Sequence, residues 1–252
     1  MMIPPLGIQL YTVRAQLAEN FKRVVRRLAA MGYVGVEFGG MYGESPAAAK
    51  KLCDELGLQI TSMHAPTPLL ENLTLALDTA KTLGARRVVC AWYPPEAFAT
   101  LDAIRATCAE LNTANEILRG NGLELLYHNH WQECARVGAK YVYQHMLDFL
   151  EPTIGFEVDV YWTKTAGLDP AAMLRELGKR APLLHIKDGP ATMDDAMTAV
   201  GDGVLDFAAI AKASQDTAEW WIVELDRCAT DILQAVESSY RYITQQGFAH
   251  GR

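Results

Sequence analysis

The sequence predicts an α/β protein, a single (β/α)8 TIM barrel in which eight parallel strands alternate with eight helices. Strand and helix patterns alternate eight times along 252 residues, a normal length for one such barrel. The strand segments are apolar on both faces, as in a parallel sheet that is covered by helices. A doubly wound open sheet usually has fewer units and often has a glycine fingerprint after its first strand, which is missing here. Because no Pro-, Gly- or Ser-rich linker divides the chain, we expect one domain, 1–252.

The first four strand–helix units occupy the N-terminal half of the chain. Short apolar runs predict strands at 6–11, 34–38, 59–64 and 87–91. Apolar residues at helical spacing predict helices over 21–31, 46–56, 69–83 and 95–119. Gly32, Gly57 and Gly84 follow three of these segments and favour helix ends there.

The other four units follow in the same order. Their strands are predicted within 123–133 and at 154–160, 182–187 and 220–225. Their helices are predicted over 142–150, 170–177, 207–213 and 232–243.

Composition narrows the function classes. The formal net charge is -7 and no basic stripe appears, so we expect no nucleic-acid partner. The five cysteines are odd in number and form no CxxC pair, which favours reduced thiols in a cytoplasmic protein. The N-terminus lacks the pattern of a signal peptide, and no apolar run is long enough for a bilayer, so we expect no membrane partner.

The stretch LELLYHNHWQE at 123–133 is the most informative in the chain. Its apolar run ends at His128, and Asn129, His130 and Glu133 follow. If the strand continues this far, His128 and His130 share one face, because residues two apart in a strand point the same way. Two imidazoles and a carboxylate are typical of a metal or proton-transfer site. The alternative is a strand end whose histidines bond to backbone groups.

Polar residues also end most of the other predicted strands. A barrel brings these ends together at one mouth, where its reactive residues lie. The polar strand ends are Gln9, Glu37, His64, His128, Asp159, His185 and Glu224, with His130, Lys187 and Asp226 two positions further on. Burying so many ionisable groups without a role would be costly, which favours a functional site.

Four of these residues form a mixed nitrogen and oxygen donor set: His128, Asp159, His185 and Glu224. Imidazole with carboxylate suits Mn, Zn, Co or Fe(II) and does not favour Ca. Glu157 would share the face of Asp159 one layer deeper, and we interpret it as a salt-bridged barrel residue.

Lys187 is predicted to be an electrophile or a base, since burial lowers a lysine pKa. Asp188 is a candidate partner for it. Trp92, Trp131 and Trp162 follow strand ends, where they either wall a sugar pocket or pack in the core.

The sequence resembles the xylose-isomerase-like sugar phosphate isomerase/epimerase family, in its YHNH-type branch. The resemblance rests on GIQLYTVR at 7–14, GYVGVEFGG at 32–40 and, in order, SMHAP, YHNHWQE, VDVYW, LLHIKDG, VGDGVLDF and IVELD. It implies one divalent metal ion (Mn, Zn, Co or Mg) at the barrel mouth, held by a carboxylate after strand five and by Asp159, His185 and Glu224. Epimerases of the ketose 3-epimerase type carry Glu where this chain has His128. Here the ligand role passes to His128, and Glu133 is the nearest carboxylate that could replace the acid/base.

The resemblance implies a sugar isomerase/epimerase. Glu224 or Glu133 would remove a proton next to a metal-polarised carbonyl and give an ene-diolate. The alternatives are an inosose dehydratase or keto-sugar lyase on the same site, and a sugar-binding barrel without turnover. Among the relatives, endonuclease-IV-like enzymes need more His and Glu ligands and a basic face, so we do not expect a nuclease.

We expect Glu37, His64, His130 and Asp188 to contact the substrate and Lys187 to assist catalysis. No Gly-rich phosphate-binding turn stands out, so the expected substrate is an unphosphorylated sugar, keto-sugar or inositol. The sequence does not exclude a homo-oligomer.

Overall fold

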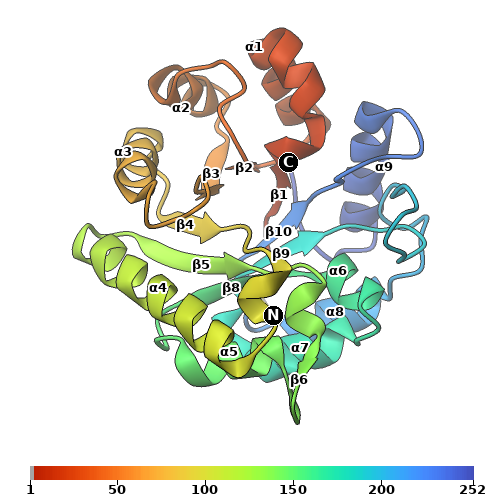
Figure 1. Ribbon diagram of the computed structural model, residues 1–252. Coiled ribbons are helices and arrows are strands. Elements are labelled where there is room, and N and C mark those ends of the chain that lie inside the picture. Colours follow the sequence, from red (N-terminus) through yellow and green to blue (C-terminus); the bar gives the residue numbers. More distant parts are fainter. Residues whose placement is uncertain (1–2) are drawn as a thin grey trace.

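The eight main strands close into a parallel barrel surrounded by helices (Figure 1). A computed structural model describes residues 3–252 of the chain. The strand order around the barrel is β1, β10, β9, β8, β5, β4, β3, β2, which confirms the predicted fold. The barrel strands are β1 (Leu6–Gln9), β2 (Gly35–Phe38), β3 (Gln59–His64), β4 (Arg87–Cys90), β5 (Glu124–His128), β8 (Gly155–Asp159), β9 (Leu183–Ile186) and β10 (Trp220–Val223).

Helices connect the strands and cover the outside of the barrel (Figure 1). The α-helices are α1 (Arg14–Met31), α2 (Pro46–Glu55), α3 (Leu73–Leu83), α4 (Leu101–Gly120), α5 (Val142–Phe149), α6 (Val160–Thr165), α7 (Pro170–Leu177), α8 (Phe207–Ser214) and α9 (Ile232–Gln245). Short 3-10 turns are η1 (Leu10–Val13), η2 (Pro95–Phe98), η3 (Gln132–Cys134) and η4 (Gly178–Arg180), and β6 (Arg136–Val137) pairs with β7 (Lys140–Tyr141). None of the helices within 3–252 has the length and apolar character that crossing a membrane requires.

Helix α1 starts earlier than its apolar spacing indicates. Its backbone is non-helical at Asn20, whose Oδ1 accepts a hydrogen bond from the backbone N–H of Arg23 at 3.0 Å. This side chain restarts the helix, so the predicted segment 21–31 corresponds to the part after the interruption. The helix ends at Gly32, whose φ of 109° is a conformation that favours glycine.

Strand β5 ends at His128, so the condition under which His128 and His130 would share a strand face is not met. Asn129 breaks the pattern, because its Oδ1 accepts the backbone N–H of Asp159 at 3.0 Å and so joins the ends of β5 and β8. The rings of His128 and His130 still lie close, with centroids 4.8 Å apart, because the turn brings His130 back toward the barrel.

The register of the strands pairs their polar ends. Gln9 is opposite Glu37, His128 is opposite Glu157, and Asp159 is opposite His185. The sequence therefore delivers polar side chains to one mouth of the barrel in two adjacent layers, while apolar side chains fill the space between strands and helices.

Candidate active site

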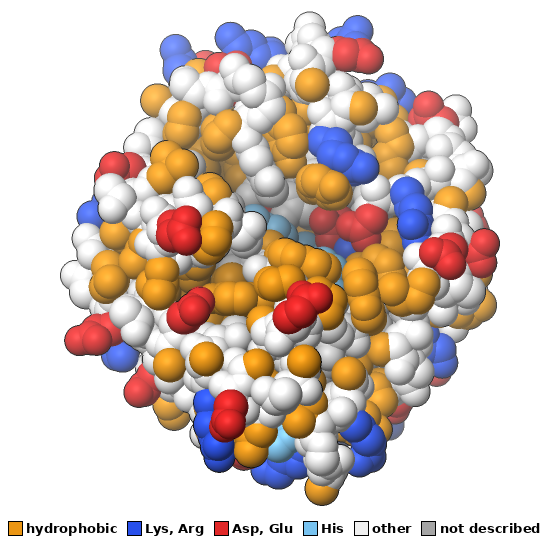
Figure 2. Space-filling view, in the orientation of Figure 1, with side chains coloured by type: hydrophobic (Ala, Val, Ile, Leu, Met, Phe, Trp, Pro, Cys, Tyr) orange, Lys and Arg blue, Asp and Glu red, His pale blue; other side chains and the backbone are white. Residues whose placement is uncertain are grey.

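A cavity of about 350 Å³ opens at the carboxyl ends of the barrel strands. Figure 2 shows the hollow, with histidine and acidic side chains on its floor and hydrophobic side chains around it. Three histidines and two carboxylates line it: His64, His128, His130, Glu224 and Asp226. Tyr11 and Trp92 form part of its rim, and no lysine or arginine in the described chain lines it.

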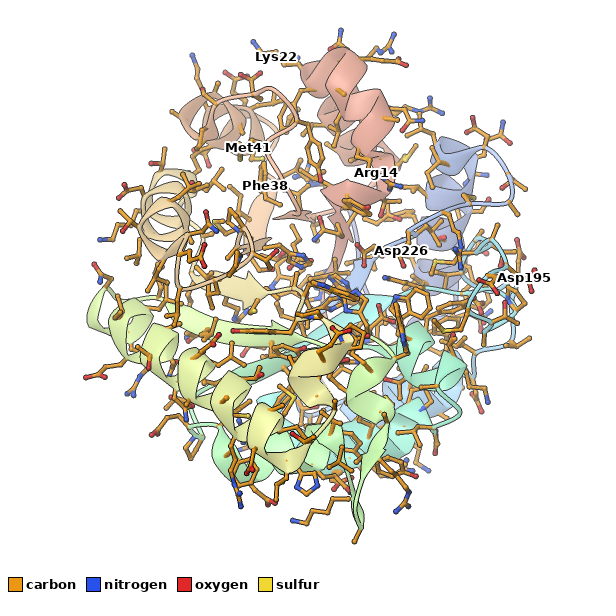
Figure 3. The ribbon with its side chains drawn as sticks, viewed as in Figure 1. Arg14, Lys22, Phe38, Met41, Asp195 and Asp226 are labelled. Atoms are coloured by element: carbon orange, nitrogen blue, oxygen red, sulfur yellow. The ribbon has the colours of Figure 1, made fainter. Side chains whose placement is uncertain are left out.

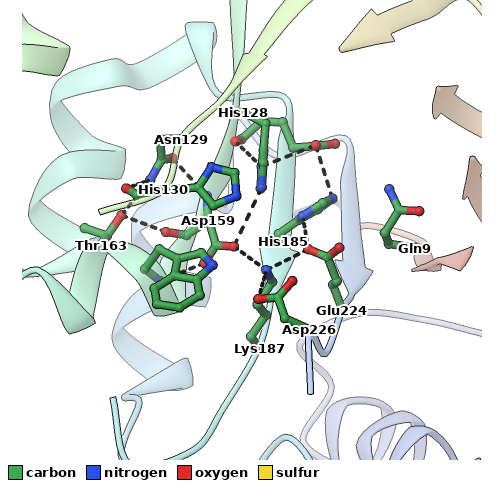
Figure 4. Close-up of polar contacts among 12 residues, drawn as sticks. Gln9, His128, Asn129, His130, Asp159, Thr163, His185, Lys187, Glu224 and Asp226 are labelled. Carbon is green, nitrogen blue, oxygen red and sulfur yellow. Dashed lines mark hydrogen bonds and ion pairs between the residues drawn. The ribbon is translucent and has the colours of Figure 1, made fainter. Parts of the chain in front are cut away.

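The four predicted metal ligands converge on one point next to this cavity. One donor atom each from His128, Asp159, His185 and Glu224 lies within 4.8 Å of all the others, and all four residues are buried. They come from the ends of β5, β8, β9 and β10, which are consecutive around the barrel (Figure 4). The geometry therefore brings together the residues that the sequence pattern assigned to one site.

The donor atoms at this point lack hydrogen-bond partners. His185 Nδ1 and Glu224 Oε2 lie 2.7 Å apart without the alignment of a hydrogen bond, and both are buried. Asp159 Oδ2 is also buried without a hydrogen bond. The Lys187 ammonium neutralises the two carboxylate oxygens but leaves His185 Nδ1 without a partner, and a shared cation would satisfy all three atoms. Two imidazoles with two carboxylates thus fit a divalent transition metal.

Lys187 lies beside these atoms and neutralises the acidic groups. Its Nζ is 2.9 Å from Asp159 Oδ2, 2.7 Å from Glu224 Oε2 and 2.8 Å from Asp226 Oδ2 (Figure 4). Burial alone would lower the pKa of Lys187, but the three carboxylates outweigh it and raise that pKa well above its usual value. The side chain is therefore a fixed ammonium, which does not fit the predicted role of a base.

The His128 imidazole is held in the neutral form that a metal ligand needs. Burial, together with His185 and His130, lowers its pKa well below the ordinary value. Its Nδ1 lies 3.3 Å from the backbone carbonyl of Glu157, and its Nε2 lies 3.9 Å from Asp159 Oδ2.

Glu37 lies beneath the cavity and does not line it, contrary to the prediction that it contacts substrate. It is completely buried, and its carboxylate accepts hydrogen bonds from Gln9 at 2.8 Å and Ser62 at 2.5 Å. Its Oε2 is also 2.6 Å from His185 Nε2. Glu37 therefore contacts the predicted ligand His185 at Nε2, the ring nitrogen that lies away from Glu224.

Asp188 organises a loop and does not pair with Lys187, and it does not line the cavity where we predicted a substrate contact. Its carboxylate accepts four backbone N–H groups, those of Gly189, Gly201, Gly203 and Leu205, at 2.9 to 3.3 Å. A Cβ on Gly203 would lie 2.1 Å from Asp188 Oδ1, which explains the second glycine of VGDG.

Glu133 is neither an exposed loop carboxylate nor part of the cavity wall. It is fully buried in η3, where one oxygen accepts the hydroxyl of Tyr127 and the other accepts the backbone N–H of His130 at 2.8 Å. Burial raises the pKa of Glu133 to about 7. Both oxygens thus fix the turn after β5, which leaves none for a substrate.

His64 and His130, both predicted to contact substrate, do line the cavity. His64 Nε2 lies 2.9 Å from Glu157 Oε2. Burial and Lys187 lower the pKa of His130 to about 3, and its ring lies edge-on to Trp92 with centroids 5.0 Å apart. Trp131 and Trp162 pack behind this pair with centroids 5.0 Å apart, so only Trp92 of the three tryptophans lines the cavity.

The sequence pattern placed Asp226 among the polar strand ends at the mouth without a role, and it placed Glu157 one layer deeper. Asp226 lines the cavity with 29% of its side chain exposed, and its signal is its position two after Glu224 on the same face. Glu157 was interpreted as a salt-bridged barrel residue, and its carboxylate does lie within ion-pair distance of three histidines.

Comparisons with known proteins agree with this geometry. The family described as xylose isomerase-like TIM barrel matches residues 25–245. Inosose dehydratase of Erwinia tasmaniensis is 23% identical, over 90% of each chain. Rhizopine catabolism protein MocC of Rhizobium meliloti is 25% identical, over 78% of this chain and 71% of that protein. The crystal structure of a sugar phosphate isomerase/epimerase from Parabacteroides distasonis superposes with a TM-score of 0.83 at 27% identity and covers 99% of this chain and 96% of that one.

Proposed function

The chain belongs to the xylose isomerase-like TIM barrel family, and from this premise we propose a divalent-metal-dependent sugar isomerase/epimerase. The observation that carries the proposal is the convergence, next to an open cavity, of donor atoms from Asp159, His185 and Glu224 that make no hydrogen bond. Homologues of this superfamily are isomerases, epimerases and dehydratases. The reactions of these enzymes share one requirement: a carbon next to a carbonyl group must lose a proton.

The metal would be held by His128, Asp159, His185 and Glu224. When bound, it would polarise the carbonyl and an adjacent hydroxyl of the substrate, which lowers the cost of removing the neighbouring proton. Mn, Zn, Co and Mg remain the candidates, and the donor set favours the transition metals over Mg.

Glu224 is the proposed base, because its carboxylate lines the cavity whereas Glu133 does not. The C–H bond next to the carbonyl breaks, the proton passes to the carboxylate and the electron pair moves onto the carbonyl oxygen. If the proton of the adjacent hydroxyl passes to the former carbonyl oxygen, return of the abstracted proton to the former carbonyl carbon gives an isomer. Delivery of a proton to the other face of the original carbon gives an epimer. The Lys187 ammonium, 2.7 Å from Glu224, keeps this carboxylate in the ionised form that a base requires.

The proposed substrate is an uncharged sugar, keto-sugar or inositol. The carboxylates of Glu224 and Asp226 lie in the cavity wall, and no lysine or arginine of the described chain lines it, so a phosphate dianion would meet repulsion there. Arg14 lies near Asp226 outside the cavity (Figure 3), and its guanidinium donates to the carbonyls of Tyr11 and Asp226 and lies 4.0 Å above the Tyr11 ring. Trp92 and Tyr11, 36% and 40% exposed, offer apolar faces for a sugar ring.

A specific feature favours a dehydratase as the second candidate. Glu224 follows β10, whereas His64 ends β3 and His130 follows β5, each three strands away around the barrel. A base on one wall of the cavity and an imidazole proton donor on another wall suit an elimination reaction. The proton passes to Glu224, the C–O bond breaks at the next carbon, and the leaving hydroxyl takes a proton from His64 and departs as water. The 23% identical relative is an inosose dehydratase.

Proton NMR in deuterated water separates the two candidates. A panel of ketoses, keto-sugars and inososes is incubated with the protein and Mn(II) or Co(II). Solvent deuterium at the carbon next to the carbonyl, without loss of water, supports the isomerase/epimerase. A new unsaturated product supports the dehydratase. Binding of a panel member by calorimetry without deuterium exchange indicates a sugar-binding barrel that lacks turnover.

A further inference from the structure

We propose that Glu157 is a positioning residue that holds the two ligand histidines in opposite tautomers, so that His128 binds the ion through Nε2 and His185 through Nδ1. The inference rests on the proposed metal site and adds the means by which the barrel presets it. Glu157 itself does not line the cavity and touches neither substrate nor ion.

One oxygen of Glu157 is shared by three imidazoles. Its Oε2 lies 2.9 Å from His64 Nε2, 3.2 Å from His185 Nε2 and 3.4 Å from His128 Nδ1. Glu157 is completely buried, so no water competes for these contacts from bulk solvent. A carboxylate at this point draws an N–H from each ring toward the barrel interior.

The strand register makes this arrangement. β8 lies between β5 and β9, and Glu157 is directly opposite His128. Asp159 is two residues further along β8, on the same face, and is directly opposite His185. Glu157 therefore forms the inner layer, beneath the histidines, and Asp159 the outer layer, beside the ion.

The contacts of His128 require its proton on Nδ1. This nitrogen is 3.3 Å from the backbone carbonyl of Glu157, which only accepts hydrogen bonds, and 3.4 Å from the carboxylate of the same residue. The lone pair is therefore on Nε2, which faces Asp159 Oδ2 at 3.9 Å.

The contacts of His185 place an N–H on its Nε2, which leaves Nδ1 as the nitrogen that can bind the ion. Its Nε2 is 2.6 Å from Glu37 Oε2 and 3.2 Å from Glu157 Oε2, so the proton belongs on Nε2. The lone pair of Nδ1 then faces Glu224 Oε2, 2.7 Å away, in a pair that lacks hydrogen-bond geometry. A lone pair facing a carboxylate is unfavourable unless a cation lies between them.

The inner layer is not itself a second metal site. Glu37, His64, Glu157 and His185 also bring donor atoms within 4.8 Å of one another. Their closest contacts, 2.6 Å for His185 with Glu37 and 2.9 Å for His64 with Glu157, are hydrogen-bond distances. Protons already fill the space between these atoms, so the chain should bind one ion.

The test measures ion binding in variants of Glu157 without reference to activity. Glu157→Met removes the acceptor at similar length, and Glu157→Gln keeps one acceptor oxygen. Glu133→Gln is the matched control, a buried carboxylate that contacts no imidazole. Calorimetry with Zn(II) and Co(II) should show one ion per wild-type chain. Glu157→Met should bind about 10- to 100-fold more weakly, Glu157→Gln should fall between Glu157→Met and wild type, and Glu133→Gln should match wild type.

Long-range ¹⁵N–¹H spectra of the Zn(II)-loaded wild-type protein test the tautomers directly, whether or not the Met variant folds. One histidine should be metallated at Nε2 and another at Nδ1. Wild-type affinity in Glu157→Met, or two histidines bound through the same type of nitrogen, overturns this inference alone. A wild-type chain that binds no ion overturns the proposed metal site and this inference with it.

Discussion

The ammonium of Lys187 lies 2.9 Å from the carboxylate of Asp159, and neither side chain is exposed to solvent. Glu224 and Asp226 contact the same ammonium. Without it, the two buried carboxylates and the partly exposed one would repel each other in the metal-free protein. Lys187 thus holds the ligand carboxylates together before an ion arrives.

Lys187→Met should lower the free energy of unfolding of the metal-free protein by about 3–5 kcal/mol, because it leaves buried charges unpaired. Saturating Mn(II) should restore part of the loss, since the ion takes over the neutralisation. Thermal denaturation with chelator and with Mn(II) measures both effects. Lys140→Met, which removes an exposed pair with Asp148, is the control and should change little. Equal stability of Lys187→Met and wild type in chelator would contradict this role.

Metal affinity should fall as the pH drops through about 6. Burial raises the pKa of Asp159 from 3.8 to about 6 in the metal-free protein. A carboxyl whose folded pKa is raised stabilises the fold most at low pH, and this contribution is lost as the pH rises from 3.8 to about 6. Metal binding needs the ionised carboxylate, so metal affinity changes with pH in the opposite direction to this stability contribution and rises as the pH increases. Calorimetric titrations at several pH values on both sides of 6 measure it, and an affinity that stays constant would disprove the assignment.

Glu133→Gln should leave kcat unchanged, because both Glu133 oxygens are engaged by Tyr127 and the His130 backbone. Glu224→Gln should lower kcat by about 10²–10⁴-fold, the usual contribution of a general base. Steady-state kinetics on a substrate found in the NMR panel compares the two. A large loss of kcat in Glu133→Gln, with the fold intact by circular dichroism, would return Glu133 to the mechanism.

Trp92→Ala should raise KM by about three- to tenfold, the cost of losing an aromatic face, and should leave ion affinity unchanged. Trp92 lines the cavity and has 36% of its surface exposed, which makes it accessible to a sugar ring. Ile117→Ala, an exposed apolar residue on α4, is the control. An unchanged KM in Trp92→Ala would show that Trp92 at the cavity rim does not contribute to substrate binding.

The barrel and the convergence of Asp159, His185 and Glu224 could be predicted from sequence. Eight alternations fix a parallel barrel, and parallel strands deliver their polar ends to one mouth whatever the loops do. The end of β5 could not be predicted in the same way. It depends on the Asn129 side chain capping the backbone of Asp159, a contact 30 residues away.

The roles of Asp188, Glu133 and Glu157 needed coordinates. Three of the four partners of Asp188 are backbone N–H groups 13 to 17 residues further along, and their positions depend on the loop conformation. Glu133 turns inward because η3 redirects the chain after His130. The layer of Glu157 in the barrel was predicted from its spacing to Asp159. The contact of three imidazoles with one of its oxygens depends on side-chain rotamers.

Ion content of the purified protein tests the account most directly. The wild-type chain, Asp159→Ala and Glu224→Gln are stripped with chelator, repleted with Mn(II), Co(II) or Zn(II), desalted and analysed by elemental mass spectrometry. The wild type should retain one ion per chain and both variants should retain much less, because each loses a ligand that His128 and His185 cannot replace. Equal ion content in all three proteins, or none in the wild type, would contradict a metal centre at Asp159, His185 and Glu224.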